Sequence, residues 1–243
     1  MISVCLAAYN GEKFIQEQIE SILNQLDGSD ELIISDNGSK DKTINIISNI
    51  GDQRIKLIHS KRTNSKTGSI NNNFHNSISL AQGDIILLSD QDDVWLPGKV
   101  KLFREQLYLN DLVLSDCIVV DSNLNTVRKS YFNDKELKLS FISTIIKNPF
   151  LGCCMGFKRS LLKEFGEIPK SRFVAHDIWI GLNAFNKRNS IGVINQPLLL
   201  YRKHEESVTS SGLKSQNNIL YKIYYRLVII VHLIIWKTRR FFN

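Results

Sequence analysis

Acidic side chains follow an apolar run in the first half of this 243-residue chain. Asp90 and Asp92 come directly after the run 84–89, and on an extended segment residues two apart project to the same side. Both carboxylates can then face one cation, and such hard oxygen ligands suit Mg²⁺ or Mn²⁺ bound together with substrate phosphates. Taken alone, an aspartate-rich turn is more often a solvated loop, so the metal site needs support from other strand ends.

Two further polar segments follow apolar runs, at residues 8–12 (Ala-Tyr-Asn-Gly-Glu) and 36–41 (Asp-Asn-Gly-Ser-Lys-Asp). The carboxyl ends of parallel strands meet at one edge of a sheet, where ligands collect. The sequence contains no GxxxxGK[ST] loop and no GxGxxG after the first predicted strand, which excludes P-loop NTPases and classical dehydrogenases. The sequence is still consistent with a site in which acidic residues and a divalent cation hold a nucleotide.

The elements that must position these segments alternate between strand and helix. The apolar patterns predict strands over 2–8, 31–35, 55–59, 84–89 and 191–194. They predict helices over 13–26, from about residue 42 with Asp41 as its cap, through 70–81 with Gly83 closing it, and over 178–185. This alternation indicates an α/β fold with a mostly parallel sheet and right-handed crossovers.

The net charge of +7 is concentrated at the end of the chain, where residues 201–243 carry eight basic and two acidic side chains. A nucleic-acid-binding protein usually spreads such charge over a folded face, so we expect no nucleic-acid partner. The apolar stretch 227–236 has basic residues on both sides, and we expect it to be too short to span a bilayer. A helix of this kind would lie on an anionic membrane surface. A last helix packed on the core, or a dimer contact, is the alternative.

The expected location is the cytoplasm, at the inner face of the cell membrane. The four cysteines form no CxxC pair, which favours reduced thiols. Met1 leads straight into an apolar strand without a basic leader, so secretion is not expected.

The ordered set of motifs resembles the family 2 glycosyltransferases, which have the GT-A fold. The motifs are AYNGE (8–12), DNGSKD (36–41), AQGD (81–84), SDQDDVW (89–95), AHDIW (175–179) and YRKH (201–204). The resemblance covers roughly residues 1–205, with a nucleotide-binding half over about 1–100 and an acceptor-binding half over about 101–205. A basic amphipathic helix over 214–243 follows. The SDQDDVW form with a later His-Asp is similar to bacterial transferases that build surface polysaccharide, including rhamnosyltransferases.

The resemblance implies a Rossmann-like, mostly parallel sheet flanked by helices, and a defined reaction. A sugar, in this subgroup rhamnose among others, is transferred with inversion from a UDP- or dTDP-linked donor to a hydroxyl of a lipid-linked oligosaccharide. A divalent cation, Mg²⁺ or Mn²⁺, assists. Two departures are visible, because Ala7 and Ala8 stand where many members have proline nearby, and Asn37 stands where many have a second aspartate.

The resemblance also implies roles for individual residues. Nucleotide contacts are expected from the strand ends, at Ala8, Tyr9, Glu12, Asp36 and Asp90. Asp92 would bind the metal on the diphosphate, and Asp177 matches the catalytic base. Contacts to the diphosphate or the acceptor are expected from Arg202, His204 and Trp179. The segment 152–156 would border the acceptor cleft, its glycines allowing close approach of a sugar.

Structural roles remain as alternatives for several of these residues. Asp177 can be an N-cap, Asp36 an ordinary turn residue, and Tyr9 and Trp179 core residues. For the whole chain, a sugar nucleotidyltransferase would use similar paired carboxylates, although 10–13 is a poor version of its basic loop. A catalytically inactive protein that binds sugar nucleotides or glycans is a third interpretation. The presence of Asp90, Asp92 and Asp177 together argues against it.

Overall fold

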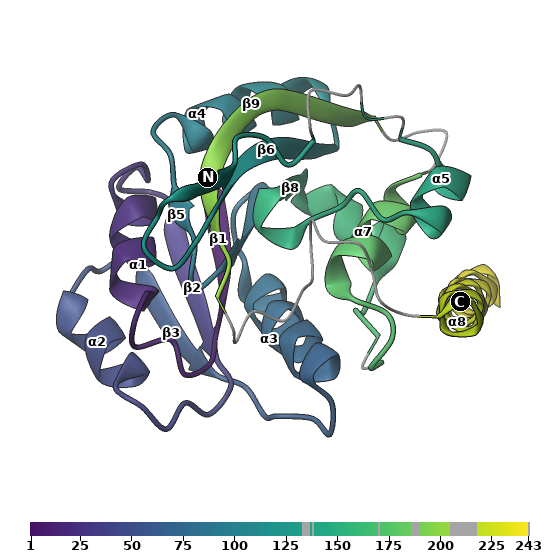
Figure 1. Ribbon diagram of the computed structural model, residues 1–243, viewed down its shortest axis with the longest axis horizontal. Helices are drawn as coiled ribbons and strands as arrows, with labels where there is room; N and C mark the ends of the chain where they lie inside the picture. The colour runs from purple at the N-terminus through teal and green to yellow at the C-terminus, as the bar shows by residue number, and fades with distance from the viewer. Residues whose placement is uncertain (133–136, 138, 170, 186–189, 205–217, 243) are drawn as a thin grey trace.

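The computed structural model describes residues 1–132, 137, 139–169, 171–185, 190–204 and 218–242 (Figure 1). Within them, nine strands form one sheet in the order β3-β2-β1-β4-β8-β6-β9-β5, with β7 paired to β6. The strands are β1 (Ile2–Ala8), β2 (Glu31–Asp36), β3 (Ile55–His59), β4 (Ile85–Asp90), β5 (Val94–Trp95), β6 (Leu112–Val120), β7 (Thr126–Arg128), β8 (Met155–Lys158) and β9 (Ile191–Arg202).

Helices cover both faces of this sheet (Figure 1). They are α1 (Ile15–Leu23), α2 (Thr43–Ile50), α3 (Lys66–Leu80), α4 (Lys99–Leu109), α5 (Phe141–Ile146), α6 (Leu162–Phe165), α7 (His176–Ala184) and α8 (Ile219–Phe242), with 3₁₀ turns η1 (Gly152–Cys154) and η2 (Arg159–Leu161). Because side chains alternate across a strand, Val4 and Leu6 pack in the core under α1, α2 and α4, whereas Cys5 packs under α3, α6 and α7.

The parallel half of the sheet brings the predicted strand ends together. Strands β1, β2, β3 and β4 run parallel, and Ala8 pairs with Asp36 while Ala7 pairs with Asp90. The polar segments after β1, β2 and β4 therefore lie side by side at one edge. The second half is mixed, because β8 runs antiparallel to both β4 and β6.

The predicted strands of the first half are confirmed, with shifts of one residue at Asp36 and Asp90. The prediction that Gly83 closes α3 is wrong, since the helix ends at Leu80 and Ala81 is its C-cap. Gly83 has a different role. A Cβ there would lie 2.6 Å from the backbone nitrogen of Ser3, so glycine is needed where the chain passes close to β1.

Helix α8 differs from its prediction in length. It begins at Ile219, and the predicted start at residue 214 lies outside the described residues. The expectation that no segment is long enough to span a bilayer is wrong, because the 21 residues Ile219–Arg239 are long and apolar enough by length and composition. Its buried residues include Ile229 and Leu233, and most of its other apolar side chains are exposed.

Candidate active site

Asp90 and Asp92, at the end of β4 and just after it, lie near Asp177 from a distant part of the chain. The strand ends at Asp90 and the chain then bends, so Asp90 and Asp92 do not share one extended segment, and that part of the prediction is wrong. They are nevertheless neighbours. Burial, followed by the charges of Asp92 and Asp177, raises the pKa of Asp90 to about 7. The three carboxylates therefore share one region of the molecule.

Asp92 is paired with a histidine from the other end of the domain. Its Oδ2 lies 2.8 Å from His204 Nε2, and the two side chains are 19% and 16% exposed. The backbone carbonyl of Asp92 accepts a hydrogen bond of 2.8 Å from Arg202 Nε. A carboxylate and an imidazole thus lie together, partly open to solvent, beside Asp90.

Asp93 is a site residue to which the sequence analysis gave no role. It is fully buried, and its Oδ1 accepts a 3.0 Å hydrogen bond from the backbone N–H of Arg202. Its Oδ2 has no hydrogen-bond partner in the described part of the chain. Burial, together with the charges of Asp92 and Asp90, raises the pKa of Asp93 well above its usual value. Below, the acidic centre means Asp90, Asp92, Asp93 and Asp177.

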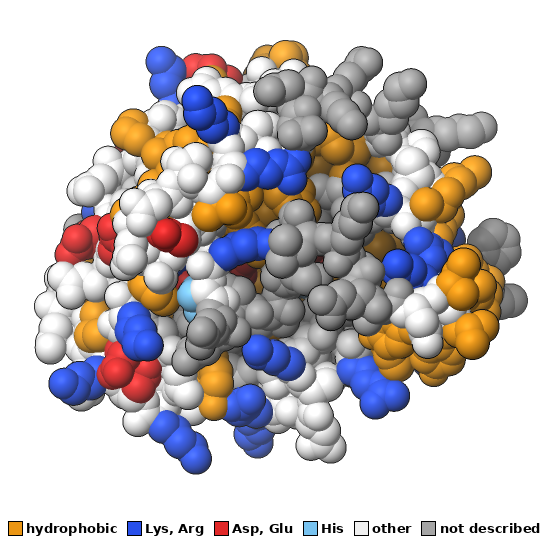
Figure 2. Space-filling model, viewed as in Figure 1, with side chains coloured by type: hydrophobic (Ala, Val, Ile, Leu, Met, Phe, Trp, Pro, Cys, Tyr) orange, Lys and Arg blue, Asp and Glu red, His pale blue; other side chains and the backbone are white. Residues whose placement is uncertain are grey.

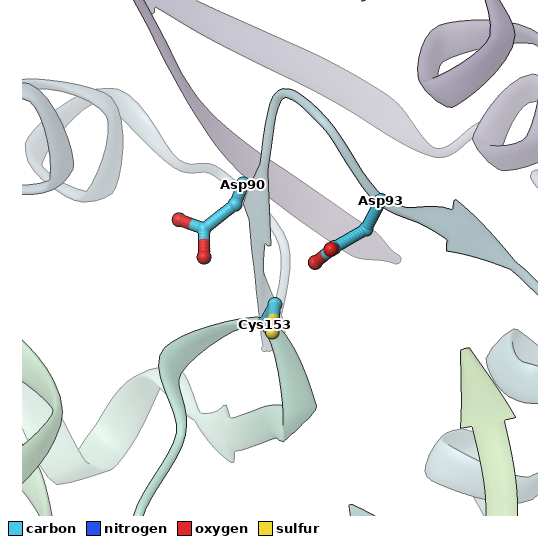
Figure 3. A group of neighbouring side chains, drawn as sticks. All are labelled: Asp90, Asp93 and Cys153. Atoms are coloured by element: carbon cyan, nitrogen blue, oxygen red, sulfur yellow. The ribbon is translucent and has the colours of Figure 1, made fainter. Parts of the chain in front are cut away.

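A second set of groups overlaps the acidic centre. Ligand atoms of Asp90, Asp93 and Cys153 lie within 4.8 Å of one another. Figure 3 shows the two aspartates on either side of the turn that follows β4, with the thiol of Cys153 from η1 close by. These are groups of the kind that hold a metal ion, although a thiol is softer than the ligands that Mg²⁺ prefers.

Lys99 is a second residue that the sequence analysis did not identify. It is fully buried, its Nζ donates a 2.7 Å hydrogen bond to the carbonyl of Cys153, and it lies 4.4 Å from the centre of the Trp95 ring. Its charge opposes the rise in the pKa of Asp90. Its only sequence signal is its place at the start of α4, which surface lysines share.

Arg202 holds the turn between β4 and β5. Besides its two bonds to residues 92 and 93, Nη1 donates to the carbonyl of Ser122 at 2.8 Å and Nη2 forms an ion pair with Glu17. The residue is 4% exposed. All three guanidinium nitrogens have partners within the protein, and the expected contact of Arg202 with a diphosphate stays a prediction.

The predicted nucleotide-binding residues lie at the ends of β1 and β2. Asp36 is buried, and it accepts hydrogen bonds of 2.9 Å from the backbone N–H groups of Gly38 and Ser39 and one from the Ser39 hydroxyl. Glu12 accepts a 2.9 Å bond from the backbone N–H of Lys42, just before α2. Asp36 therefore also has the turn role considered above. Its nucleotide contact stays a prediction.

Tyr9 completes this region, which we call the nucleotide edge (Tyr9, Glu12 and Asp36). The side chain of Gln91 bonds both backbone groups of Tyr9, at 2.7 Å to its N–H and 3.0 Å to its carbonyl, and so ties β1 to the turn after β4. Arg62 lies 4.0 Å from the centre of the Tyr9 ring. Ala8 is buried beside them at the end of β1.

Asp177 lies in the first turn of α7 and is not its N-cap, which is Ala175. Its Oδ1 accepts a 2.6 Å hydrogen bond from the backbone N–H of Ile178. Burial raises the pKa of Asp177 to about 6, opposed by this bond and by a hydrogen bond from Asn148. A carboxylate with this pKa is ionised at neutral pH and is a stronger base than an ordinary aspartate.

The neighbouring His176 is buried against Phe74, with ring centres 4.0 Å apart, and neither ring nitrogen has a partner among the described residues. Burial lowers its pKa to about 3, so the ring is neutral. Its Nε2 fills the space beside Gly152, where a Cβ would lie 2.4 Å away. Gly156 likewise faces the side chains of Leu87 and Phe103, so both glycines make room for protein side chains, and the approach of a sugar to 152–156 stays a prediction.

Trp179 is a core residue. It is 2% exposed, and its Nε1 donates a 2.9 Å hydrogen bond to the carbonyl of Phe165. The structure therefore supports the core role that was the alternative for Trp179, and its contact with an acceptor stays a prediction.

Curated relatives share most of the chain. It is 29% identical over 230 residues to the dTDP-rhamnosyl transferase RfbG of Shigella flexneri, covering 91% of this chain and 77% of that protein. It is 25% identical to the UDP-Glc:alpha-D-GlcNAc-diphosphoundecaprenol beta-1,3-glucosyltransferase WfgD of Escherichia coli, covering 95% and 92%.

Solved structures show the same fold. Residues 1–349 of S. aureus TarS with UDP-GlcNAc align with a TM-score of 0.69 at 21% identity, covering 95% of this chain and 66% of that one. This chain therefore spans slightly less than two thirds of that structure. Glucosyl-3-phosphoglycerate synthase from Mycobacterium tuberculosis, in complex with Mn²⁺, UDP and phosphoglyceric acid, aligns with a TM-score of 0.56 at 22% identity, covering 84% and 71%.

The model of one protein family matches residues 3–166, which is more than half of the chain, and its description is Glycosyl transferase family 2. Together with the sheet and its structural neighbours, this match confirms the GT-A fold and the resemblance carried by the motifs. The chain belongs to glycosyl transferase family 2 and is a glycosyltransferase.

Proposed function

We propose that this enzyme transfers a sugar, with inversion, from a UDP- or dTDP-linked donor to a hydroxyl of a lipid-linked oligosaccharide in bacterial surface polysaccharide synthesis. The observation that carries the proposal is the convergence of Asp90, Asp92 and Asp177 on one site. The printed names of two relatives support its substrate classes, since one is a dTDP-rhamnosyl transferase and another acts on a diphosphoundecaprenol-linked sugar. Rhamnose is therefore the first donor sugar to try.

The acidic centre fits a divalent cation. Burial, followed by the charges of Asp92 and Asp177, raises the pKa of Asp90, and a cation beside these carboxylates would offset their repulsion. We assign the ion to Asp92 and His204, with Asp90 beside them, because these side chains are partly open whereas Asp93 and Cys153 are buried. When bound, Mg²⁺ or Mn²⁺ stabilises the negative charge of the departing nucleoside diphosphate.

Asp177 is proposed as the base. It removes the proton of the acceptor hydroxyl while that oxygen attacks the anomeric carbon of the donor sugar. The bond from this carbon to the diphosphate oxygen breaks as the new glycosidic bond forms, so the configuration is inverted. Proton transfer of this kind typically contributes about 10²–10⁴-fold to a rate.

Helix α8 supports a location at a membrane surface. Its outward side, at the right of Figure 2, is covered by hydrophobic side chains. The inward side is fastened to the domain, because Arg226 donates to the carbonyls of Ile145 and Ile146, and Trp236 Nε1 donates to the carbonyl of Glu164. A helix held along the domain from residue 226 to 236 suits a bilayer surface better than a span. We propose a cytoplasmic enzyme, peripheral on the inner face of the membrane.

The reaction class is tested with the full chain, Mn²⁺, a lipid-linked glycan extract and a panel of UDP-, dTDP- and GDP-sugars. We expect release of a nucleoside diphosphate, dependent on both the metal and the extract. Release of pyrophosphate would instead indicate a nucleotidyltransferase. Binding of a nucleotide sugar without turnover of any donor would indicate a binding protein, and the proposed function would be wrong.

The membrane location is tested by placing charge on the outward side of α8. Leu227 and Val231 are about half exposed and one helical turn apart, and the double variant Leu227→Glu/Val231→Glu should lose most of its co-sedimentation with vesicles containing anionic lipid. Leu109→Glu, at a leucine that is 70% exposed at the end of α4, is the control outside α8 and should sediment like the wild type. Equal sedimentation of all three proteins would exclude α8 as the membrane contact.

A further inference from the structure

A hollow of about 420 Å³ lies between the loop that precedes α7 and the first turns of α8. We call it the aromatic pocket, and it is lined by Arg172, Phe173, Tyr221 and Tyr224. The Phe173 ring meets the Tyr224 ring edge-on at 5.3 Å and lies 6.4 Å from that of Tyr221. The guanidinium of Arg172 lies 4.6 Å from the centre of the Phe173 ring. The lining therefore combines three aromatic rings with one cation, which lies over the ring of Phe173.

The chemistry of this lining suits an anionic group attached to an apolar one. Arg172 is exposed and forms no ion pair with the part of the chain that the structure describes. Its planar fork of donors matches the oxygens of a phosphate. The lining contains no acidic side chain, and Tyr221 and Tyr224 are 43% and 52% exposed, so their rings offer apolar surface to a ligand.

The aromatic pocket lies between the proposed base and the outward side of α8. Phe173 comes four residues before Asp177, so even a fully extended chain separates their Cα atoms by at most about 14 Å. Tyr225, next to Tyr224, is close enough to the base that the charge of Asp177 contributes to raising its pKa. In the other direction, Tyr224 is followed at helical spacing by the exposed Leu227 and Val231.

We propose that the aromatic pocket binds the diphosphate and the first isoprenoid units of the lipid-linked acceptor. Arg172 would bond the diphosphate oxygens, and the three rings would pack on the isoprenoid chain as it leaves along α8 toward the bilayer. This inference rests on the proposed function, in which a lipid-linked hydroxyl must reach Asp177. It also implies that the hydroxyl lies within the first sugars after the diphosphate, because the pocket is so near the base.

The experiment measures binding of geranylgeranyl diphosphate to the full chain in mild detergent by isothermal titration calorimetry. Arg172→Gln should weaken binding about tenfold or more, since it removes a charge-assisted bond to phosphate. Phe173→Ala should weaken it by a similar factor through lost apolar contact. Lys163→Gln removes an exposed charge on α6, outside the pocket, and should bind like the wild type.

Two further ligands identify what the pocket recognises. Geranylgeraniol, which lacks the diphosphate, should bind more weakly than the diphosphate and equally well to wild type and Arg172→Gln. Inorganic pyrophosphate should bind much more weakly than the lipid. The proposal is overturned if Arg172→Gln binds the lipid diphosphate like the wild type, or if pyrophosphate alone binds as tightly, which would identify a free-anion site.

Binding of UDP and dTDP, and turnover of the donor panel, separate this inference from the proposed function. Arg172→Gln and Phe173→Ala should bind the nucleotides like the wild type and show a raised KM for the lipid acceptor. Donor turnover with lipid binding that is insensitive to both variants would overturn the pocket alone. If the protein turns over no donor, the proposed function is overturned, whether or not the lipid diphosphate binds.

Discussion

The nucleotide edge and the acidic centre hold their polar groups in opposite ways. At the nucleotide edge, the carboxylate of Asp36 accepts three hydrogen bonds and that of Glu12 accepts one from the start of α2. In the acidic centre, Asp93 keeps an unpartnered oxygen among the described residues. Burial raises the pKa values of Asp90, Asp93 and Asp177, and repulsion from neighbouring carboxylates adds to the rise at Asp90 and Asp93. At the nucleotide edge, hydrogen-bond donors of the protein, mostly backbone N–H groups, satisfy the carboxylates. In the acidic centre, the carboxylates lack enough such donors.

This difference separates residues that fix the shape of the site from residues that carry out the reaction. Carboxylates bonded to backbone N–H groups fix their loops before any ligand arrives, which preorganises a surface for a nucleotide. Buried carboxylates without enough partners cost stability, and clusters of them with displaced pKa values are typical of catalytic sites. We therefore expect substitutions in the acidic centre to change the rate, and those at the nucleotide edge to change donor affinity and stability.

The largest expected effect comes from Asp92→Asn. Loss of the proposed metal ligand should lower nucleoside diphosphate release by about 10³-fold or more, because stabilisation of a leaving group by a cation is worth several kcal/mol. The variant should fold, since Asp92 holds the Arg202 side chain through its backbone carbonyl and not its carboxylate. Release is measured with and without Mn²⁺, and melting is followed by circular dichroism.

Glu105→Gln, an exposed acid-to-amide change on α4, is the control for Asp92→Asn and should keep full activity. Asp92→Asn should also lower the pKa of Asp90, since the charge of Asp92 is one of the causes that raise it. Wild-type turnover by Asp92→Asn would show that the acidic centre does not carry the reaction.

The next largest effect concerns pH and Asp177. A base with a pKa of about 6 is ionised above that pH and protonated below it, so transfer should fall about tenfold per unit below pH 6. Asp177→Asn should lose on the order of 10²–10⁴-fold in transfer and show no inflection near pH 6, while nucleotide binding is kept. An unchanged inflection in Asp177→Asn would assign it to another group.

Stability gives an independent check on the same residue. The pKa of Asp177 is higher in the folded protein, at about 6, than the ordinary value of 3.8. The ionised carboxylate therefore costs stability above pH 6, and this cost disappears as the pH falls through 6 toward 4. Asp177→Asn should accordingly melt higher than the wild type at pH 7.5 and show a smaller difference at pH 4.5.

The parallel half of the fold was predictable because its signals are local. Strands β1 to β4 are short apolar runs followed by polar turns, and each was found within one residue of its end. The second half depends on pairing between distant segments. Strand β9 was predicted only over 191–194 because Pro197 interrupts the pattern, yet the strand continues to Arg202 with irregular register against β6.

Site residues that the order of the motifs identifies could be predicted from the sequence. Residues whose role is decided by burial could not. Asp92 and Asp177 were identified by their motifs, and their nearness through Asp90 supports the prediction. Arg202, predicted as a ligand, is buried by its own ion pair with Glu17, and Lys99 is buried although most lysines are exposed. The burial of Arg202 and of Lys99 could not be predicted from the local sequence, because both depend on chain segments that meet only in the folded protein.

The smallest expected effect comes from the packing around His176. Gly152→Ala would place a Cβ 2.4 Å from the Nε2 of the His176 ring, which is buried and stacked on Phe74. We expect a loss of about 1–3 kcal/mol in unfolding free energy, measured by urea denaturation, because the addition overfills a packed site. Transfer should also fall several-fold, since Asp177 is the next residue along α7. Gly28→Ala, where nothing lies within 4 Å of the added atom, is the matched control and should leave both quantities unchanged. If Gly152→Ala is as stable and as active as Gly28→Ala, the His176 ring can move aside. The residues around Asp177 would then be packed less tightly than our comparison of the acidic centre with the nucleotide edge assumes.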